Sequence, residues 1–168
     1  MTVFFTADTH FGHGGAMGLF RRPFSGTREM DETLIANWNA VVGPDDTVWH
    51  LGDFADRPSM ERATRLLESL NGTKHLIPGN NDPDLVRAHP AWASVSDYVE
   101  MELDGRMLRM CHYPFRSWRD DRRGAWNLHG HSHGRLKPLT RQRDVGVDVW
   151  DFRPVTLDVL TRRWMRKG

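Results

Sequence analysis

The chain has 168 residues, of which 39% are hydrophobic and 27% are charged, and its formal net charge is +1. This composition predicts one folded domain over residues 1–168 and excludes a disordered chain or a strongly basic duplex-binding domain. No apolar stretch reaches the roughly 18 residues of a membrane span, and the N-terminus lacks the features of a signal peptide. The single cysteine, Cys111, excludes an internal disulfide, so we expect a cytoplasmic protein with no membrane partner.

In the first half of the chain, apolar runs alternate with polar, glycine-rich loops. Strands are predicted over residues 3–6, 47–51 and 74–77, and apolar residues at helical spacing predict helices over residues 30–41 and 59–70. Strands that alternate with helices in this way are typical of right-handed crossovers and a parallel sheet.

The second half is predicted to be rich in strands. Residues 96–103 and 106–111 predict a hairpin around Asp104-Gly105, and further strands are predicted over residues 125–128, 145–149 and 155–160. An antiparallel set that follows parallel units favours an α/β architecture in which two sheets pack together.

Five of the apolar runs end in a loop that carries Asp, His or Asn beside glycine. Because sites in open α/β sheets lie beyond the carboxyl ends of the strands, we expect these loops to meet. Their candidate metal ligands are Asp8, His10, Asp53, Asn80, His112, His131 and His133. Seven oxygen and nitrogen ligands exceed the needs of one ion with open positions, which favours two ions that share a carboxylate.

The order of these blocks resembles that of the calcineurin-like metallophosphoesterases, in particular the small bacterial-type members. The matching blocks are Asp8-x-His10, Gly52-Asp53, Gly79-Asn80, His112 and Gly130-His131-x-His133, and the resemblance covers nearly the whole chain. The resemblance implies an α/β fold in the form of a four-layer αββα sandwich, with two mixed β-sheets flanked by helices and two divalent metal ions at the sheet ends.

The resemblance also implies roles for the ligands. One ion would be held by Asp8, His10, Asp53 and His133, and the other by Asp53, Asn80, His112 and His131, so that Asp53 bridges them. Mn²⁺ is the expected ion, with Fe, Zn²⁺ and Ni²⁺ as alternatives. A hydroxide that bridges the metals would attack the phosphorus of a phosphate ester, and no protein nucleophile is required.

One block departs from the family pattern. Many relatives carry His directly after the Gly-Asn pair, whereas this chain carries Asn81. That His is usually assigned to protonating the leaving group or to stabilising the transition state. Asn81 can hydrogen-bond phosphate but has no titratable proton, and Asp82 is expected to orient neighbouring groups. The sequence therefore favours phosphodiesters, cyclic nucleotides or activated aryl esters over alkyl monoesters.

Several residues leave two interpretations open. His13 is either a replacement general acid or a structural hydrogen-bonding group. Two groups of arginines either contact substrate phosphate or belong to solvated surface: Arg21 and Arg22 after the first metal loop, and Arg116, Arg119, Arg122 and Arg123 after His112. The candidate substrate-binding residues are Asn80, Asn81 and Arg116.

The other histidines and one aspartate also carry expectations. His50 and His129 are predicted to be hydrogen-bonded core histidines, His75 and His89 to be ordinary strand and surface residues, and Asp148 to orient a metal-binding histidine.

Three functions remain open from the sequence. The first is a metal-dependent hydrolase of phosphodiesters or nucleotides, and the second is a phosphomonoesterase or nucleotide pyrophosphatase. The third, a non-catalytic scaffold with the same fold, is disfavoured because all seven ligands are present. Expected partners are small phosphate esters or nucleotides, with RNA ends as a further candidate, and the sequence assigns no oligomeric state.

Overall fold

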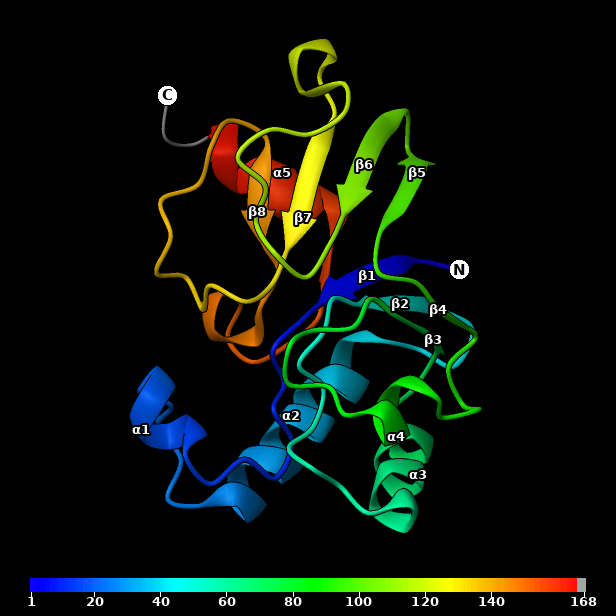
Figure 1. Cartoon of the computed structure of the whole chain (residues 1–168), viewed down its shortest axis with the longest axis vertical. Coiled ribbons are helices and arrows are strands. Elements are labelled where there is room, and N and C mark those ends of the chain that lie inside the picture. Colours follow the sequence, from blue (N-terminus) through cyan, green and yellow to red (C-terminus); the bar gives the residue numbers. More distant parts are fainter. Residues whose placement is uncertain (166–168) are drawn as a thin grey trace.

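The structure, a computed structural model, describes residues 1–165. Two mixed β-sheets pack face to face with helices around them, which confirms the predicted α/β architecture (Figure 1). In the view of Figure 1, the first sheet crosses the middle of the molecule, helices α2, α3 and α4 lie below it, and the second sheet and helix α5 lie above it. No helix among residues 1–165 is long and apolar enough to cross a membrane.

The first sheet has the strand order β4-β3-β2-β1-β9. Its strands are β1 (Val3–Thr6), β2 (Thr47–His50), β3 (Thr73–Leu76), β4 (Ser94–Val95) and β9 (Val155–Thr156). Strands β1 to β4 are parallel, and β9 pairs antiparallel with β1. The crossovers contain α2 (Thr27–Val41), α3 (Met60–Ser69) and α4 (Asp84–Arg87), and the short helix α1 (Ala16–Phe20) precedes α2.

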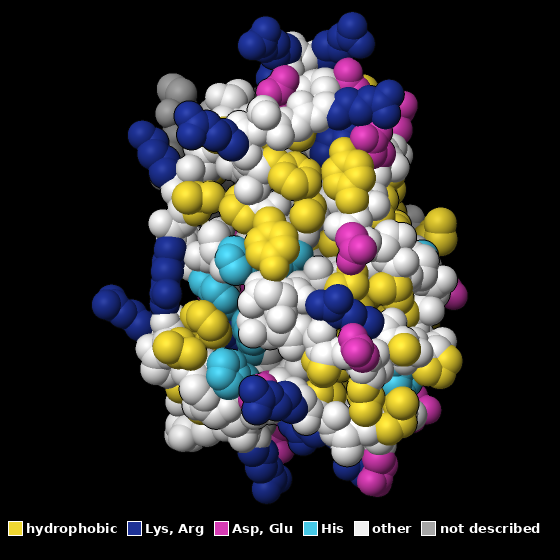
Figure 2. Space-filling view, viewed as in Figure 1, with side chains coloured by type: hydrophobic (Ala, Val, Ile, Leu, Met, Phe, Trp, Pro, Cys, Tyr) yellow, Lys and Arg dark blue, Asp and Glu magenta, His cyan; other side chains and the backbone are white. Residues whose placement is uncertain are grey.

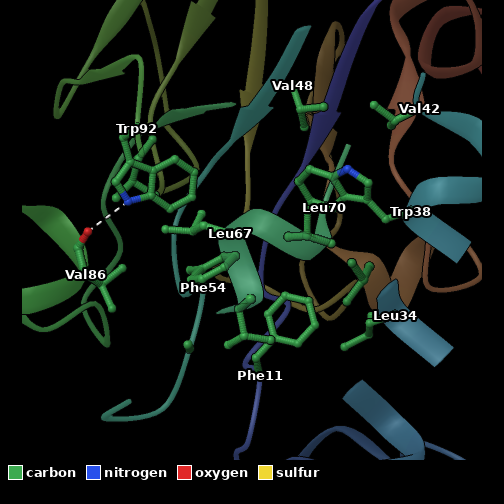
Figure 3. Close-up of a cluster of buried hydrophobic side chains, with 14 of the residues drawn as sticks. Phe11, Leu34, Trp38, Val42, Val48, Phe54, Leu67, Leu70, Val86 and Trp92 are labelled. Atoms are coloured by element: carbon green, nitrogen blue, oxygen red, sulfur yellow. Dashed lines mark hydrogen bonds between the residues drawn. The ribbon is translucent and has the colours of Figure 1, made fainter. Parts of the chain in front are cut away.

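One face of the first sheet packs against α2 and α3. Because side chains alternate along a strand, Phe4 and Val48 lie in the cluster with Leu34, Trp38 and Leu67, which Figure 3 shows in part. The neighbouring strand residues on the other face contribute to a second cluster, between the sheets, that contains Phe5, Leu51, Ile77, Leu108 and Leu128. Burial on both faces explains the continuous apolar run Val3-Phe4-Phe5 of β1.

The second sheet has the order β5-β6-β7-β8. Strands β5 (Val99–Leu103) and β6 (Arg106–Met110) form the predicted hairpin, whereas β6, β7 (Trp126–His129) and β8 (Gln142–Asp144) run parallel. The expected antiparallel set is therefore confined to the hairpin and to β9. Parallel β6 and β7 end at the same edge of the sheet, which places the loops after them together.

Two predicted strands are wrong. Residues 145–149 contain a 3₁₀ helix at Val147–Val149, in which the Val149 N–H donates to the Gly146 carbonyl at 3.0 Å. Within residues 1–165, strand-like pairing of this segment is limited to one isolated bridge between Gly146 and Ala7. Of residues 155–160, only Val155–Thr156 pairs with β1, and helix α5 (Leu157–Met165) begins directly afterwards. The buried Leu157 and Leu160 have the three-residue spacing of a helix face, which the strand prediction overlooked.

The expectation for His89 is also wrong. Its side chain is buried rather than at the surface, and its Nε2 lies 2.9 Å from the Thr64 hydroxyl of α3. His50 and His129 are buried and hydrogen-bonded, as predicted: His50 Nε2 lies 2.9 Å from Thr9 Oγ1, and His129 Nδ1 lies 2.7 Å from the Gly130 carbonyl.

Candidate metal centre

The candidate ligands follow the carboxyl ends of five strands, and the fold brings these ends together. Ligand atoms of Asp8, His10 and His133 lie within 4.8 Å of one another, and so do ligand atoms of Asp8, Asp53 and His112. Histidine side chains gather on the face shown in Figure 2, between the two halves of the molecule. The predicted convergence of the loops is thus present in the geometry.

The backbone at the ligands is unusual. Five of the seven candidates have left-handed φ angles: Asp8 (58°), His10 (49°), Asp53 (57°), His131 (66°) and His133 (47°). Such angles cost on the order of 1–3 kcal/mol each in residues with a side chain, and persist only where the surroundings impose them. Here cross-loop hydrogen bonds do so, because Asp8 N donates to the Gly52 carbonyl at 2.9 Å and His10 N to the Asp53 carbonyl at 3.0 Å.

Two glycines allow these loops to touch. A Cβ atom on Gly79 would lie 2.2 Å from Asp53 Oδ1, and one on Gly52 would lie 2.4 Å from the Gly79 nitrogen. Any side chain at either position would therefore displace the loop that carries Asp53.

The first ligand set consists of Asp8, His10 and His133. Asp8 Oδ2 and His10 Nε2 are buried and have no hydrogen-bond partner among the described residues. Burial raises the pKa of the Asp8 carboxyl well above its ordinary value, and the nearby Asp144 and Asp53 raise it further. Burial also lowers the pKa of the His10 imidazole to about 3. Buried polar atoms without partners are costly, and an acceptor pair of this kind fits a divalent cation.

Asp53 lies between the two ligand sets. Its Oδ2 is 3.5 Å from His10 Nε2 and 3.7 Å from His112 Nε2. Burial acts to raise the pKa of the Asp53 carboxyl, but the neighbouring His112 and two hydrogen bonds from Asn81 outweigh it and lower the pKa. Asn81 donates from its backbone N to Oδ1 at 2.8 Å and from Nδ2 to Oδ2 at 2.7 Å. The position suits a carboxylate that two ions share.

The second ligand set contains His112, Asn80 and His131 beside Asp53. His112 Nδ1 donates to the Leu51 carbonyl at 2.7 Å, so its Nε2 carries a lone pair towards Asn80 Oδ1, 3.1 Å away. Two acceptors at this separation again fit a cation. The His131 ring lies 5.1 Å from the His112 ring, and both His131 and Asn80 are exposed.

Asp82 supports the loop of Asp53, as predicted for an orienting residue. Its carboxylate accepts from the backbone N of Asp53 and of Gly79 at 2.8 Å and from that of Phe54 at 2.7 Å. Burial raises the pKa of Asp82 despite these hydrogen bonds. This carboxylate therefore ties the loops after β2 and β3 together.

Asp148 and Arg22 support the first ligand set. Asp148 Oδ2 accepts from His133 Nδ1 at 2.7 Å, the contact that the sequence suggested. Arg22 donates to both oxygens of Asp148 at 2.8 and 2.9 Å and to the backbone carbonyls of Asp8 and Thr9. The phosphate contact considered for Arg22 is therefore wrong, because its buried guanidinium is engaged by the protein.

Two supporting residues were missed by the sequence. Phe20 of α1 stacks on His133 with ring centroids 3.6 Å apart and planes 8° apart. Asp144 accepts from Ser132 Oγ at 2.7 Å and from Gly134 N at 2.8 Å, and so holds the loop of His131 and His133. In the sequence, the only feature that could have marked Asp144 as a supporting residue is its position four residues before Asp148. No sequence feature marked Phe20.

The remaining predicted site residues differ in position. The His13 ring lies 5.4 Å from the His10 ring, and its buried Nδ1 has no hydrogen-bond partner within residues 1–165. Arg116 is exposed, and in the described part of the chain no hydrogen bond or ion pair joins it to another candidate site residue. The geometry therefore brings His13 to the ligands and leaves Arg116 at the surface.

Comparison with known proteins agrees with this site. The profile of the family "Calcineurin-like phosphoesterase" matches residues 1–167. The chain belongs to the calcineurin-like phosphoesterase family. Family members bind divalent metals through Asp and His side chains. In this phosphoesterase, Asp8 Oδ2 and His10 Nε2 are buried without a hydrogen-bond partner among the described residues, which fits such a site.

Relatives of this phosphoesterase cover most of its length. An uncharacterized protein of Methanocaldococcus jannaschii is 32% identical over 168 residues, which cover 95% of this chain and 89% of that protein. The gene 66 protein of Mycobacterium phage D29 is 32% identical, with 88% of each chain covered. A solved structure from Aquifex aeolicus, described as a protein of unknown function, has a TM-score of 0.72, 23% identity and coverage of 98% of this chain and 97% of its own. This last likeness shows the fold alone.

Proposed function

We propose that this phosphoesterase uses two divalent metal ions and prefers phosphodiesters, including cyclic nucleotides. The observation that carries the proposal is the pair of buried acceptor groups on Asp8 and His10, unpaired and beside Asp53. One ion would be held by Asp8, His10, Asp53 and His133, and the other by Asp53, Asn80, His112 and His131. Carboxylate, amide and imidazole ligands without a thiolate are compatible with Mn²⁺, which we propose as the metal, and also with Fe, Zn²⁺ and Ni²⁺. When bound, the ions would neutralise charge on phosphate oxygens and lower the pKa of a water to about 7.

Hydrolysis of a diester forms a bond from the water oxygen to phosphorus and breaks one phosphorus–oxygen ester bond. The departing oxygen must gain a proton, either from a protein acid or from solvent. Asn81 holds Asp53 through its amide and supplies no such proton. Because general acids contribute about 10²–10⁴-fold, esters that leave readily, such as cyclic and aryl diesters, are the substrates that this site favours.

His13 is the residue that could replace the missing acid. It lies beside His10, and its ring is partly exposed, so a leaving oxygen at the ligand cluster can approach it. Proton donation by His13 would extend the activity to phosphate monoesters, which is the second candidate function.

A substrate panel with added Mn²⁺ tests the proposal. It compares bis-aryl phosphodiesters, adenosine 2′,3′-cyclic phosphate and a sugar monophosphate, with the Asp53→Ala variant as control. We expect the highest kcat/KM for the diesters and no turnover by the variant. A higher kcat/KM for the sugar monophosphate would contradict the diester preference, and the absence of metal-dependent turnover would support the non-catalytic scaffold.

A further inference from the structure

The net charge of +1 conceals two halves of opposite charge. Residues 1–103 contain 8 Lys and Arg and 15 Asp and Glu, whereas residues 104–168 contain 15 Lys and Arg and 7 Asp. The first stretch builds four strands of the first sheet and helices α1 to α4, and the second stretch begins in the β5–β6 hairpin and builds the rest of the second sheet. The candidate ligands come from both stretches, so the site lies where an acidic half meets a basic half.

A strip of exposed cations leads away from the site along the basic half. We call Arg135, Lys137 and Arg141 the basic strip; no Asp or Glu occurs between Asp121 and Asp144. Their segment runs from the carboxyl end of β7 to the start of β8, the edge strand of the second sheet (Figure 1). All three side chains are exposed, and none forms an ion pair within residues 1–165.

The strip begins beside the first ligand set. The Arg135 guanidinium lies 5.7 Å from the centre of the Phe20 ring, and Phe20 stacks on His133. Arg135 also donates to the Leu19 carbonyl, which fixes this end of the strip to α1. Figure 2 shows Lys and Arg side chains along the border of the histidine group.

An exposed aromatic ring lies on the other side of the ligands. Tyr113 is 45% exposed, and its ring lies 4.9 Å from the His131 ring and 5.1 Å from the His112 ring. The following loop is fixed to the second sheet, because Phe115 N donates to Asn127 Oδ1 and the Phe115 carbonyl accepts from Gln142 Nε2. A fixed aromatic face beside a phosphate site suits the stacking of a base.

We infer that the phosphoesterase acts on the end of a single-stranded RNA. Tyr113 stacks on the terminal base, and the basic strip binds backbone phosphates further along the strand. The inference rests on the proposed function for its reaction, which is hydrolysis of the terminal phosphodiester. The observation behind it is charge complementarity: a row of cations without ion-pair partners starts at the candidate metal centre, and RNA carries one negative charge per nucleotide.

The first experiment compares adenosine 2′,3′-cyclic phosphate with an eight-nucleotide RNA that ends in a 2′,3′-cyclic phosphate. With Mn²⁺ present, we expect a KM for the RNA at least tenfold below that for the mononucleotide at 50 mM salt. The difference should shrink at 200 mM salt, because contacts to phosphates weaken as salt rises. Equal KM values at both salt concentrations, with turnover of both substrates, would overturn the inference and leave the proposed function intact.

The second experiment measures binding without metal or turnover. Anisotropy of a labelled RNA with a 3′-phosphate is compared for the wild type, Lys137→Gln/Arg141→Gln and the charge-matched control Arg28→Gln/Arg65→Gln on α2 and α3. Arg135 is spared because it contacts α1. We expect the strip variant to bind more weakly, with a slope of log K against log salt that is shallower by about 1.4, and the control to bind as the wild type does. Equal weakening in both variants would overturn the inference.

Tyr113 is tested with the same RNA. Loss of one stacked base corresponds to about a 5- to 150-fold rise in Kd, which we expect for Tyr113→Leu but not for Tyr113→Phe. If RNA binding depended on the basic strip but no substrate were turned over, the proposed function would be contradicted. The assignment of the basic strip as an RNA-binding surface would still stand. Strip-dependent binding to vesicles with phosphatidylserine, without strip-dependent binding of RNA, would overturn the inference in favour of a membrane.

Discussion

The two candidate ligand sets differ in how the surrounding structure holds them. Asp8, His10 and His133 are enclosed, and Asp148, Arg22 and Phe20 contact them or their backbone. In the other set, His112 is held by the Leu51 carbonyl, but Asn80 and His131 are exposed. Ligands whose other atoms are already hydrogen-bonded lose less freedom when they bind an ion. The difference therefore predicts a retained ion in the enclosed set and a more exchangeable ion, open to substrate, in the exposed set.

The largest expected effect comes from Asp53, the carboxylate between the sets. We expect Asp53→Asn to lower the affinity for both ions. The kcat for a bis-aryl phosphodiester should then fall by more than about 10⁴-fold. Metal content after dialysis and kcat are measured together. Asp56→Asn, at an exposed acid nearby, is the control and should retain both properties. If Asp53→Asn still held two ions after dialysis, Asp53 would not be the carboxylate that joins the two ligand sets.

The next effect concerns His13, which lies beside the enclosed set. If His13 protonates the leaving oxygen, His13→Gln lowers kcat for an alkyl ester by about 10²–10⁴-fold and leaves an activated aryl ester little changed. The variant should also lose the fall in kcat at high pH, since an acid catalyst must be protonated. Unchanged kcat and pH profile for both esters would assign His13 a structural role.

A smaller effect distinguishes the two sets directly. Asp148→Asn removes the carboxylate behind His133 and should lower affinity for one ion by about 10–100-fold, with the other ion little affected. Titration calorimetry with Mn²⁺ measures both affinities, and Asp151→Asn, at an exposed acid paired with Arg153, is the control. Equal loss at both ions would contradict the difference between the enclosed and exposed sets.

The smallest effect is a pH dependence of stability. Burial lowers the pKa of His50 to about 3, so below its ordinary value of about 6.5 the unfolded chain binds a proton that the folded chain does not. His50 thus stabilises the metal-free fold fully above about pH 6.5, and this contribution is lost as pH falls towards 3. His50→Gln should flatten the change of the free energy of unfolding between pH 6.5 and 4.5, measured with urea. The same slope in the variant would assign it to other groups.

Local sequence patterns predicted the parts of the molecule that local physics dictates. The buried strands and helices α2 and α3 show clear apolar periodicity, and both helices are found within a few residues of the predicted bounds. The 3₁₀ helix at Val147–Val149 was predicted as a strand because valines alternate along it. Its Asp148 is held by Arg22, 126 residues earlier in the chain, and no local pattern shows this contact.

The site residues also divide into those that local sequence identifies and those that only contacts distant in sequence place. The seven candidate ligands could be named because each follows a predicted strand closely, and parallel strands end at one edge of a sheet. Arg22 could not be placed, because its partner Asp148 is 126 residues away in the sequence. Arg116 lies at the surface, and its contact with substrate phosphate stays a prediction.

The left-handed backbone at five ligands has a consequence for the dynamics of the chain. We expect the strain and the buried acceptors without hydrogen-bond partners to lower the local stability of these loops in the metal-free protein. Amide hydrogen exchange around Asp8–His10 and His131–His133 should therefore be faster without metal than with it. An ion that binds only the folded chain stabilises it, so the temperature of unfolding should rise with Mn²⁺ concentration. Metal binding and slower amide exchange in these loops should then appear together, because the loops of the candidate metal centre become ordered as one cooperative unit.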